Sequence, residues 1–563
     1  MHWLETQPEV NPERIASHLV CLERTHQSAN YLAQAAQNAA HQLAFDRAAG
    51  LWIQALHLRI STEGVFEPHE IEEIRSWMIA CAHAMWGAGR GRDSALMLLR
   101  ASEGMGTNGL DLRRQAAERL MVSGYLDEGI EVSRKIAQTL GVNLPKSATV
   151  AALSLLWSRI RVRLRGFDFV PQEEQTLSHQ SLLHADILAS LSRGLALTNH
   201  ILGANCSARY LLIALSLGEP RRVMEAMTLE ANFAAAVSVN SSYVRRILDV
   251  VETQKDLCRD FSAEVFVHAA HGYVDYMSGE WARARENAQM AFQFWSHQTG
   301  TFWERTLMRL LMCWSTFYLG DIQRLAREIP AVIREANDRG DLLTLASMVS
   351  GLNNTAFLET QGSQEALARV EDVMSRWSHT GYHMQHYFAL LAHVQAHLFA
   401  MDSAAAAACI RKDERDLKRS WLLRVPSVRH EYWHFCGKAA ILEALSMPIG
   451  SQREAKLREA EDWANKAVQS PLTWVQGTGY ALFGAIAHAR GNSKTVAYLR
   501  QALNRFQVTQ MGLYAAAVRL RLANLVKGDE GQQLANMARD FFASQGLRSE
   551  ENWLSLLVPG FSI

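Results

Sequence analysis

The chain has 563 residues, and its 57 lysines and arginines balance its 57 aspartates and glutamates, so the formal net charge is zero. A chain without excess positive charge has no bulk electrostatic attraction to nucleic acid or to an anionic membrane surface, which argues against both as partners. Its seven cysteines are scattered singly and form no CxxC pair, a usage that argues against a disulfide framework or a zinc ribbon and fits a reducing cytoplasm.

The amino-terminal part of the chain has the pattern of helical hairpins. Its first residues show no basic region followed by an apolar core, and no run of eighteen apolar residues occurs anywhere, so we expect a soluble, cytoplasmic protein. Residues 38–59 fit two helices separated by a short break, and further hairpin turns are predicted near Gly89 and Gly124. We therefore predict amino-terminal helical repeats over residues 1–140.

Three glycines in this part match a nucleotide-binding pattern. Gly104, Gly106 and Gly109 fit GxGxxG, but no strand-like segment precedes them, so we interpret them as a flexible loop between helices. A protein kinase also needs an HRD catalytic loop and a DFG aspartate, and a P-loop ATPase needs GxxxxGK followed by serine or threonine. None of these motifs occurs in the sequence, so we expect a chain that is not an enzyme of either class.

The rhythm of hairpins breaks between residues 140 and 171. An apolar helix there carries arginines at every second position, namely Arg159, Arg161, Arg163 and Arg165. On a helix this spacing wraps positive charge around one end, which we interpret as a solvated terminus favoured by the helix dipole; a phosphate or nucleic-acid contact is the alternative. Residues 141–260 are predicted to form an irregular helical middle segment.

A turn signal returns about every forty residues in the second half of the chain. It falls at Gly279, Gly320, Gly362, Asp402, Gly450, Gly491 and Gly528. Apolar residues with helical spacing follow the turns, as in Ile322, Leu325 and Ile329. A period of this size without strand-like stretches predicts an all-α, tetratricopeptide-like solenoid of helical hairpins over residues 261–563, an α-α superhelix with a repeat of about 40 residues.

The register of these repeats selects a candidate binding surface. Concave positions fall roughly three and six residues before a turn glycine, and the matching positions of the next repeat lie near two asparagines. The selected residues are Tyr273, Tyr276, Trp314, Phe317, Asn353 and Asn354. Aromatics in a groove suit recognition of a peptide or a helix, whereas an aromatic stripe inside the stack would be packing core. Packing core is the favoured interpretation of the aromatic stripe, and contact of these residues with a protein or peptide partner is the functional prediction beside it.

One short motif matches a catalytic pattern. His430, Glu431 and His434 spell HEYWH, and histidines at i and i+4 of a helix share a face on which they could bind Zn²⁺, with Glu431 as general base. A zinc-dependent hydrolase at residues 430–434 is therefore the alternative to a binding function. Position 440, where an extended zinc motif would place a third histidine, is Ala440, and the segment fits the packed first helix of a repeat. We favour that structural role and predict no cofactor.

Two further histidines lie on the first helix of the preceding repeat. His393 and His397 are also spaced i and i+4, and first helices of adjacent repeats are neighbours in a solenoid. They could therefore join His430 and His434 in a metal-binding or pH-sensing cluster of four. Ordinary hydrogen-bonded histidines are the favoured interpretation.

Several segments, in the same order, resemble one bacterial family. They include LAFDRAAGLWIQAL, SGYLDEGIEVSRKIAQTLGVNLP, LLWSRIRVRLRGFDF and the carboxy-terminal ARDFFASQGLRSEENWLSLLVPGF. These segments are similar to the carboxy-terminal repeat region of large bacterial multidomain serine/threonine kinases, in which a kinase domain is followed by an AAA-like, STAND-type ATPase and then by tetratricopeptide-like repeats. The resemblance covers almost the whole chain, which lacks the kinase and ATPase motifs. It implies a sensing or scaffolding arm in bacterial signalling, with a kinase or an AAA-type ATPase as partner.

Overall fold

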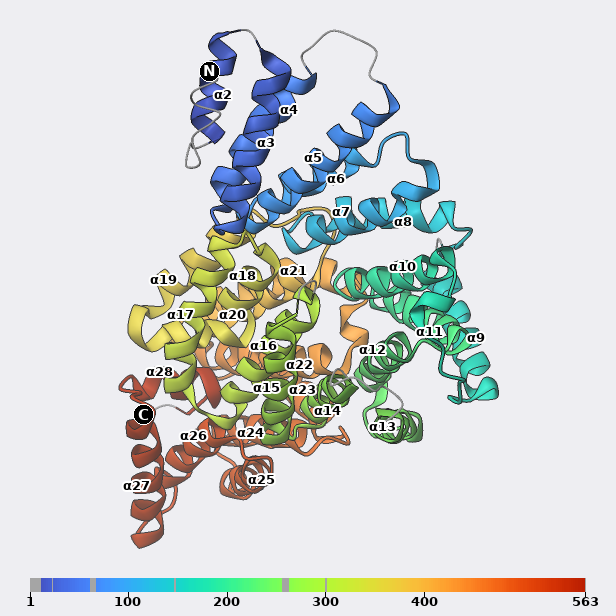
Figure 1. The fold of residues 1–563 in the computed structure, drawn as a ribbon. Coiled ribbons are helices and arrows are strands. Elements are labelled where there is room, and N and C mark those ends of the chain that lie inside the picture. The colour runs from blue at the N-terminus through green and yellow to red at the C-terminus, as the bar shows by residue number, and fades with distance from the viewer. Residues whose placement is uncertain are drawn as a thin grey trace. The chain divides into compact units, whose positions relative to one another are not determined.

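The structure, a computed structural model, describes residues 12–22, 24–60, 67–145, 148–255, 263–298 and 301–561. All regular secondary structure in these ranges is helical, and consecutive helices pack against each other (Figure 1). The prediction of an all-α solenoid built from helical hairpins is therefore confirmed. Within the same ranges, every helix is too short or too polar to span a bilayer. The first eleven residues and Cys258, which entered the sequence arguments, lie outside the described part of the chain.

The chain forms two compact units. Unit 1 comprises residues 1–144 with 334–344, and unit 2 comprises residues 145–333 with 345–563. The short second segment of unit 1 contains the last turn of α17 (Ile322–Asp338) and the first residues of α18 (Leu342–Val349). The division predicted from the sequence, with boundaries at residues 140 and 260, stays a prediction.

Unit 1 contains seven described α-helices and one 3₁₀ turn. The elements are α2 (Pro12–Cys21), α3 (Thr25–His41), α4 (Phe45–Ile60), α5 (Pro68–Gly87), α6 (Gly91–Ala101), the 3₁₀ turn η1 (Gly106–Gly109), α7 (Leu110–Val122) and α8 (Leu126–Thr139). The hairpin predicted within residues 38–59 corresponds to the end of α3 and to α4. Gly89 and Gly124 lie in the turns before α6 and α8, and the GxGxxG glycines lie in the interhelical segment that contains η1, as predicted.

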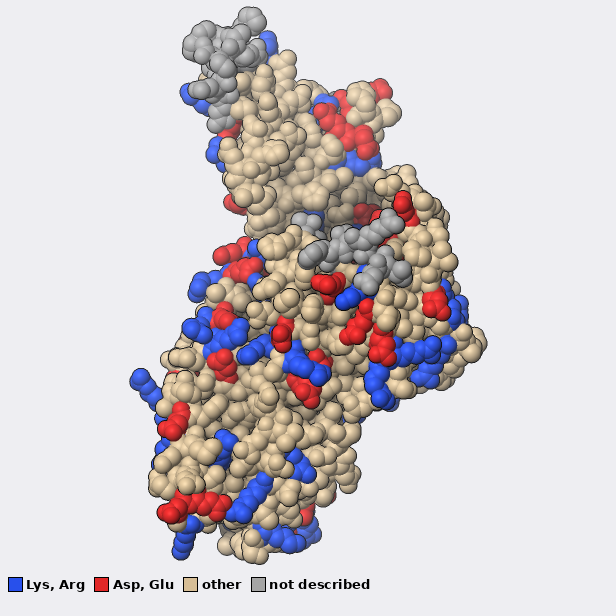
Figure 2. Space-filling view, turned by 60° about the horizontal axis from the view of Figure 1, so that its bottom comes forward, with Lys and Arg blue, Asp and Glu red and all other residues tan. Residues whose placement is uncertain are grey.

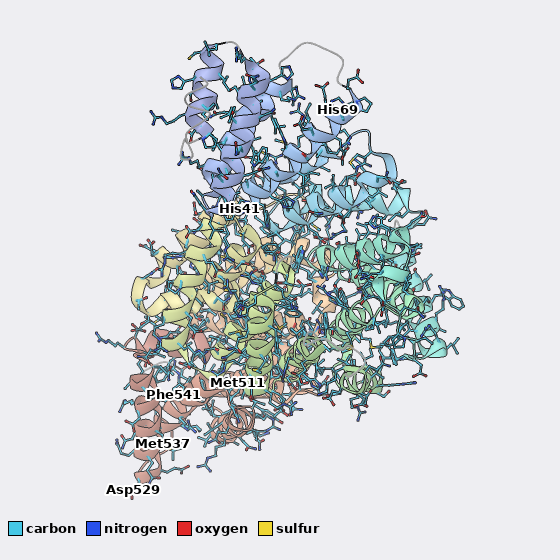
Figure 3. All side chains as sticks on the ribbon, viewed as in Figure 1. His41, His69, Met511, Asp529, Met537 and Phe541 are labelled. Carbon is cyan, nitrogen blue, oxygen red and sulfur yellow. The ribbon has the colours of Figure 1, made fainter. Side chains whose placement is uncertain are left out.

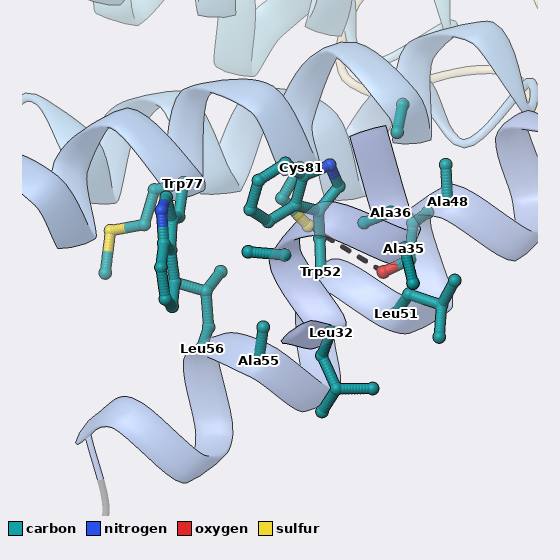
Figure 4. Close-up of a cluster of buried hydrophobic side chains, with 14 of the residues drawn as sticks. Leu32, Ala35, Ala36, Ala48, Leu51, Trp52, Ala55, Leu56, Trp77 and Cys81 are labelled. Atoms are coloured by element: carbon teal, nitrogen blue, oxygen red, sulfur yellow. Dashed lines mark hydrogen bonds between the residues drawn. The ribbon is translucent and has the colours of Figure 1, made fainter. Parts of the chain in front are cut away.

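The core of unit 1 combines alanines with a few large side chains. Trp52 of α4 and Trp77 of α5 pack with their ring centroids 5.9 Å apart, and the Sγ atom of Cys81 lies 4.0 Å from the carbonyl oxygen of Ala49 (Figure 4). Alanines let helix backbones approach closely, while the two indoles fill the remaining volume. This alternation of small and large residues explains why helices with few leucines still form a packed stack.

Unit 2 continues the pattern of paired helices. Its first part contains α9 (Ala148–Arg165), η2 (Glu174–Thr176), α10 (His179–Ala196), α11 (His200–Leu217), α12 (Pro220–Ser238) and α13 (Ser242–Gln254). Its repeats contain α14 (Ala263–Ser278), α15 (Trp281–Ser296), α16 (Phe302–Leu319), η4 (Gly351–Asn354), α19 (Thr355–Ser375), α20 (Met384–Phe399), α21 (Ser403–Arg419), η5 (Leu422–Arg424), α22 (Pro426–Ser446), α23 (Ser451–Val468), α24 (Thr473–Ala489), α25 (Thr495–Val508), α26 (Gly512–Ala523), α27 (Asp529–Ser544) and α28 (Glu550–Leu557).

Most predicted turns separate the two helices of a pair. Gly279, Gly320 and Gly491 have positive φ angles and follow the first helix, and Asp402 caps α21 by accepting a hydrogen bond from Ala405 N at 3.0 Å. Gly362 differs, because it lies inside α19 with φ 79° and ψ 169°. The chain is helical on both sides of Gly362, so this turn is a sharp kink without a loop.

In unit 2, helices that are distant in sequence come into contact beside Gly320. The end of α16 packs against the start of α26. A Cβ atom at Gly320 would stand 2.6 Å from the backbone nitrogen of Leu513 and 2.8 Å from Cζ of Phe541. Figure 3 labels Phe541 on α27 and Met511 immediately before α26. The contact therefore joins helices that are almost 200 residues apart in the chain.

Replacing Gly320 by alanine is expected to destabilise the protein by about 2 kcal/mol more than replacing Gly491 by alanine. Both glycines have positive φ (91° and 65°), so both substitutions strain the backbone. Only Gly320 faces another backbone, because a Cβ at Gly491 meets nothing within 4 Å. Midpoints of urea unfolding followed by circular dichroism would compare the two variants. Equal midpoints would show that a side chain at position 320 does not disturb the contact between α16 and α26.

Candidate functional site

The HEYWH motif lies on α22, in the interior of unit 2. Pro426 begins the helix at its first turn, where a missing N–H costs nothing. His430, Glu431 and His434 are all buried, and so is Lys438 one turn further along. Four titratable side chains on one buried helix are unusual, because burial of a charge is costly unless the charge is paired or removed by titration.

Glu431 is held by two tyrosines from other repeats. The hydroxyl of Tyr318, on α16, donates a hydrogen bond to Oε1 at 2.8 Å, and the hydroxyl of Tyr387, on α20, lies 3.2 Å from Oε2 and 3.0 Å from the carbonyl oxygen of Val428. Burial raises the pKa of Glu431 to about 7, and the two tyrosine hydroxyls oppose that shift. The Glu431 carboxyl group therefore gains or loses its proton near neutral pH.

Aromatic rings from further repeats surround this carboxyl group. Trp281 stacks on Tyr318 with ring centroids 4.1 Å apart and meets Trp474 edge-on at 5.6 Å. Tyr276 packs against Trp281 at 5.4 Å, and burial together with the nearby Glu431 carboxyl raises its pKa well above the usual value. Side chains from α14, α15, α16 and α24 thus fill the space beside α22.

The two motif histidines face aromatic rings. The His430 ring lies 5.3 Å from Trp433 and 6.0 Å from Trp474, and the His434 ring lies 5.9 Å from Tyr514. Burial lowers the pKa of His430 to about 4, and burial followed by the Lys438 charge lowers that of His434 well below its usual value. Both imidazoles are therefore neutral at pH 7.

A metal centre is not supported by this arrangement. Among the described residues, no three histidine, cysteine, aspartate or glutamate side chains come together in a way that could hold a metal ion. The hypothesis that His393 and His397 join His430 and His434 in a metal-binding cluster therefore has no support among the described residues, and a pH-sensing cluster stays a prediction. Glu431 does not have the open position that a general base needs to activate water, because its two oxygens face tyrosine hydroxyls.

Lys438 is a functional candidate that sequence reasoning missed. Its Nζ donates to the carbonyl oxygen of Leu556 at 2.7 Å and lies 5.0 Å from the Phe435 ring centroid and 5.7 Å from that of Tyr514. Leu556 is in the last turn of α28, where carbonyl groups lack helical partners, so the lysine caps that helix. Burial lowers the pKa of Lys438 to about 7. The available signal was a lysine between small and apolar neighbours, since Cys436 and Gly437 precede it and Ala439, Ala440 and Ile441 follow it.

The residues predicted to contact a partner lie inside unit 2 or at its edge. Tyr276, Trp314 and Phe317 are buried, and Tyr273 is half-buried. Trp314 meets Phe388 at 4.8 Å, and Phe317 meets Tyr514 at 6.4 Å. In this structure the stripe therefore packs against other repeats, in line with the favoured interpretation. Its role in partner binding stays a prediction.

The two asparagines of the same prediction stabilise a break in the chain. Asn353 and Asn354 lie in η4, between α18 and α19, and both are buried. Their Nδ2 atoms donate to the carbonyl oxygens of Ser347 and Val349, each at 3.0 Å. Asparagine amides commonly satisfy backbone groups where a helix is interrupted. Contact of these asparagines with a partner also stays a prediction.

Comparison with known proteins adds little to this picture. No protein-family model matches the chain, and no curated protein matches it in sequence. Among solved structures, the chain is similar to one described as "Crystal structure of APC/C hetero-tetramer Cut9-Hcn1", with 13% identity, a TM-score of 0.41, and coverage of 95% of this chain and 90% of that chain. A likeness at this level carries no argument about function.

Proposed function

We propose that the chain is a non-catalytic scaffold that binds a protein partner and acts in bacterial signalling, in the cytoplasm, together with a serine/threonine kinase or an AAA-type ATPase. The observation that carries the proposal is the state of the HEYWH motif, whose chemically capable side chains are all engaged in packing and hydrogen bonds. A stack of paired helices without a catalytic centre suits protein recognition. The resemblance to the repeat arm of kinase-ATPase proteins supports the signalling context.

The proposal leaves the zinc hydrolase without a supporting observation. That alternative needs two histidine nitrogens and a third ligand directed at one point, with Glu431 free to hold a water molecule. Here the Glu431 oxygens accept hydrogen bonds from the chain itself, and the histidine rings lie against indole and phenol rings. The buried polar cluster therefore serves the packing of the repeats.

Purification of the tagged, full-length chain from its native cells tests this function. We expect a kinase or an ATPase to be recovered in equimolar amount, identified by mass spectrometry, and the recovered chain to carry no stoichiometric zinc by elemental analysis. The untagged strain is the control for non-specific recovery. A chain recovered alone with one equivalent of zinc that is lost in His434→Ala would reverse the ranking of the two functions.

A further inference from the structure

Helix α9 exposes a long apolar stripe. Its members are 37 to 82% exposed and comprise Val150, Leu153, Leu156, Trp157, Ile160 and Leu164. Five of them follow the spacing 3-4-3-4 along α9, which places them on one face of the helix. Elsewhere in unit 2 the same spacing marks faces that pack against a neighbouring helix, as in α17, where Ile322, Leu325 and Ile329 are buried.

The opposite face of α9 holds the helix in this orientation. Arg159 Nε lies 2.7 Å from Oε1 of Glu230, which is completely buried on α12. Asn205 of α11 donates to the hydroxyl of Ser154 at 2.9 Å, and Val162 is buried beside them. A buried ion pair is costly to break, so it fixes the rotation of α9 about its axis. The stripe therefore faces outward as a consequence of the fold.

Arg161, Arg163 and Arg165 are exposed, as a solvated helix end predicts, whereas Arg159 is only partly exposed. Arg159 is bound to buried Glu230, and Arg165 donates from Nη2 to the carbonyl oxygen of Leu215 at 2.7 Å. Arg163 lies over the ring of Tyr243, 5.2 Å from its centroid. The spacing of the arginines correctly predicted a helix. The ring that Arg163 contacts and the carbonyl group that Arg165 binds lie on helices that are distant in sequence.

Positive charge borders the stripe on both sides. At about 100° per residue, Arg161 falls beyond one edge of the stripe and Arg163 beyond the other, and both are exposed. Arg246 of α13 lies over the ring of Phe167, just after α9. On the right-hand side of Figure 2, the side on which Figure 1 places α9 and α13, basic side chains lie together with acidic ones.

We propose that α9 is the docking surface for an acidic amphipathic helix of the partner. In heptad terms five of the six stripe residues occupy a and d positions and Leu156 falls at g, while Arg161 is at e and Arg163 at g of the last heptad. A complementary helix therefore has apolar a and d residues and glutamates at e and g. The stripe spans about four helical turns, roughly 22 Å, enough for a partner helix of two to three heptads. This inference rests on the proposed scaffold function and names its surface.

The charged edges and the narrow apolar seam distinguish this partner from the two other candidate occupants. A second copy of the chain would present arginines on its own stripe instead of the acidic groups that the rim favours. A lipid surface would also accept arginines, but a helix that lies in a membrane surface needs a wider apolar face than the seam of a and d positions that is typical of helix–helix contacts.

Binding of a designed peptide to the full-length chain tests the proposal. The probe is a fluorescent three-heptad helix with leucine at a and d and glutamate at e and g, and its counterpart has lysine at e and g. We expect saturable binding of the glutamate peptide, binding of the lysine peptide that is at least about tenfold weaker, and weakening by added salt. Trp157→Glu should reduce the affinity at least about tenfold, whereas Val508→Glu, at an exposed valine of α25, should leave it unchanged.

Several outcomes would overturn the proposal. They are no binding of the glutamate peptide, equal binding of both peptides, binding of phosphatidylserine vesicles that is lost in Trp157→Glu, and dimerisation in sedimentation that is lost in the same variant. Circular dichroism confirms that each variant is folded. If Leu153→Glu combined with Trp157→Glu still recovers the kinase or ATPase from cells, the scaffold function stands and the α9 surface is wrong. If the peptide binds but no such enzyme is recovered, the surface stands and the signalling context is wrong.

Discussion

Replacing Lys438 by methionine is expected to remove a gain in stability of about 3 kcal/mol that the natural protein shows as the pH rises from about 7 to about 9.5. Burial lowers the pKa of Lys438 from 10.5 to about 7, and its hydrogen bond goes to the neutral carbonyl of Leu556. Between these two pH values the unfolded chain binds a proton that the folded chain has released. The free energy of unfolding therefore rises with pH in this window, and each pH unit contributes about 1.4 kcal/mol.

The difference in stability between Lys438→Met and the natural protein isolates the titration of Lys438. Urea midpoints are measured at several values from pH 7 to 9.5, and the variant's curve is subtracted so that cysteine and tyrosine titrations cancel. Loss of the hydrogen bond to Leu556 shifts the stability of the variant by the same amount at every pH, so it leaves the slope of stability against pH unchanged. Lys466→Met, at an exposed lysine over the Trp463 ring, is the control and should follow the natural protein. Parallel curves for Lys438→Met and the natural protein would show that the buried ammonium does not titrate in this range.

The local signals in the sequence were sufficient to predict the helical pairs. Gly320 and Gly491 mark turns because a positive φ is least costly for glycine, a property of the residue itself. What the two glycines face was not predictable. Gly320 lies against Leu513 and Phe541, whereas Gly491 faces open space. That difference depends on how tightly the repeats curl, which is decided by side-chain packing between helices far apart in sequence.

The same limit applies to the buried cluster on α22. The sequence places HEYWH on a first helix of a repeat, and the aromatic stripe at concave positions, because both follow from helical spacing. The partners of Glu431, however, are Tyr318 and Tyr387, which lie 113 and 44 residues away in the chain. A motif match cannot reveal that these hydroxyls donate hydrogen bonds to the Glu431 carboxylate. It also gives no reason to single out Lys438, whose environment is set by α28 and α26.

Replacing Glu431 by glutamine is expected to remove one contribution to the pH dependence of stability, a loss of about 3 kcal/mol that the Glu431 carboxyl group causes between about pH 4.5 and 7. The folded-state pKa is raised from 4.5 to about 7 because the carboxyl group is buried. In this window the folded chain holds a proton that the unfolded chain has released, so the free energy of unfolding falls as the pH rises. Above pH 7 the full cost of the buried charge is present. Glutamine keeps the shape of the side chain and an acceptor for Tyr318, and it cannot ionise.

The measurement is again a difference in urea midpoints, here from pH 4.5 to 7, so that titration of other carboxyl groups cancels. Glu365→Gln, at a glutamate on the exposed side of α19, is the matched control and should leave the pH profile unchanged. A natural protein whose profile parallels that of Glu431→Gln would contradict the raised pKa. Glu431 contributes a loss of stability up to pH 7 and Lys438 a gain above it, while the lowered pKa values of His430 and His434 contribute a gain below about pH 6.5. The histidine contributions cancel in each difference curve, so Glu431→Gln and Lys438→Met combined should show the sum of the two single differences.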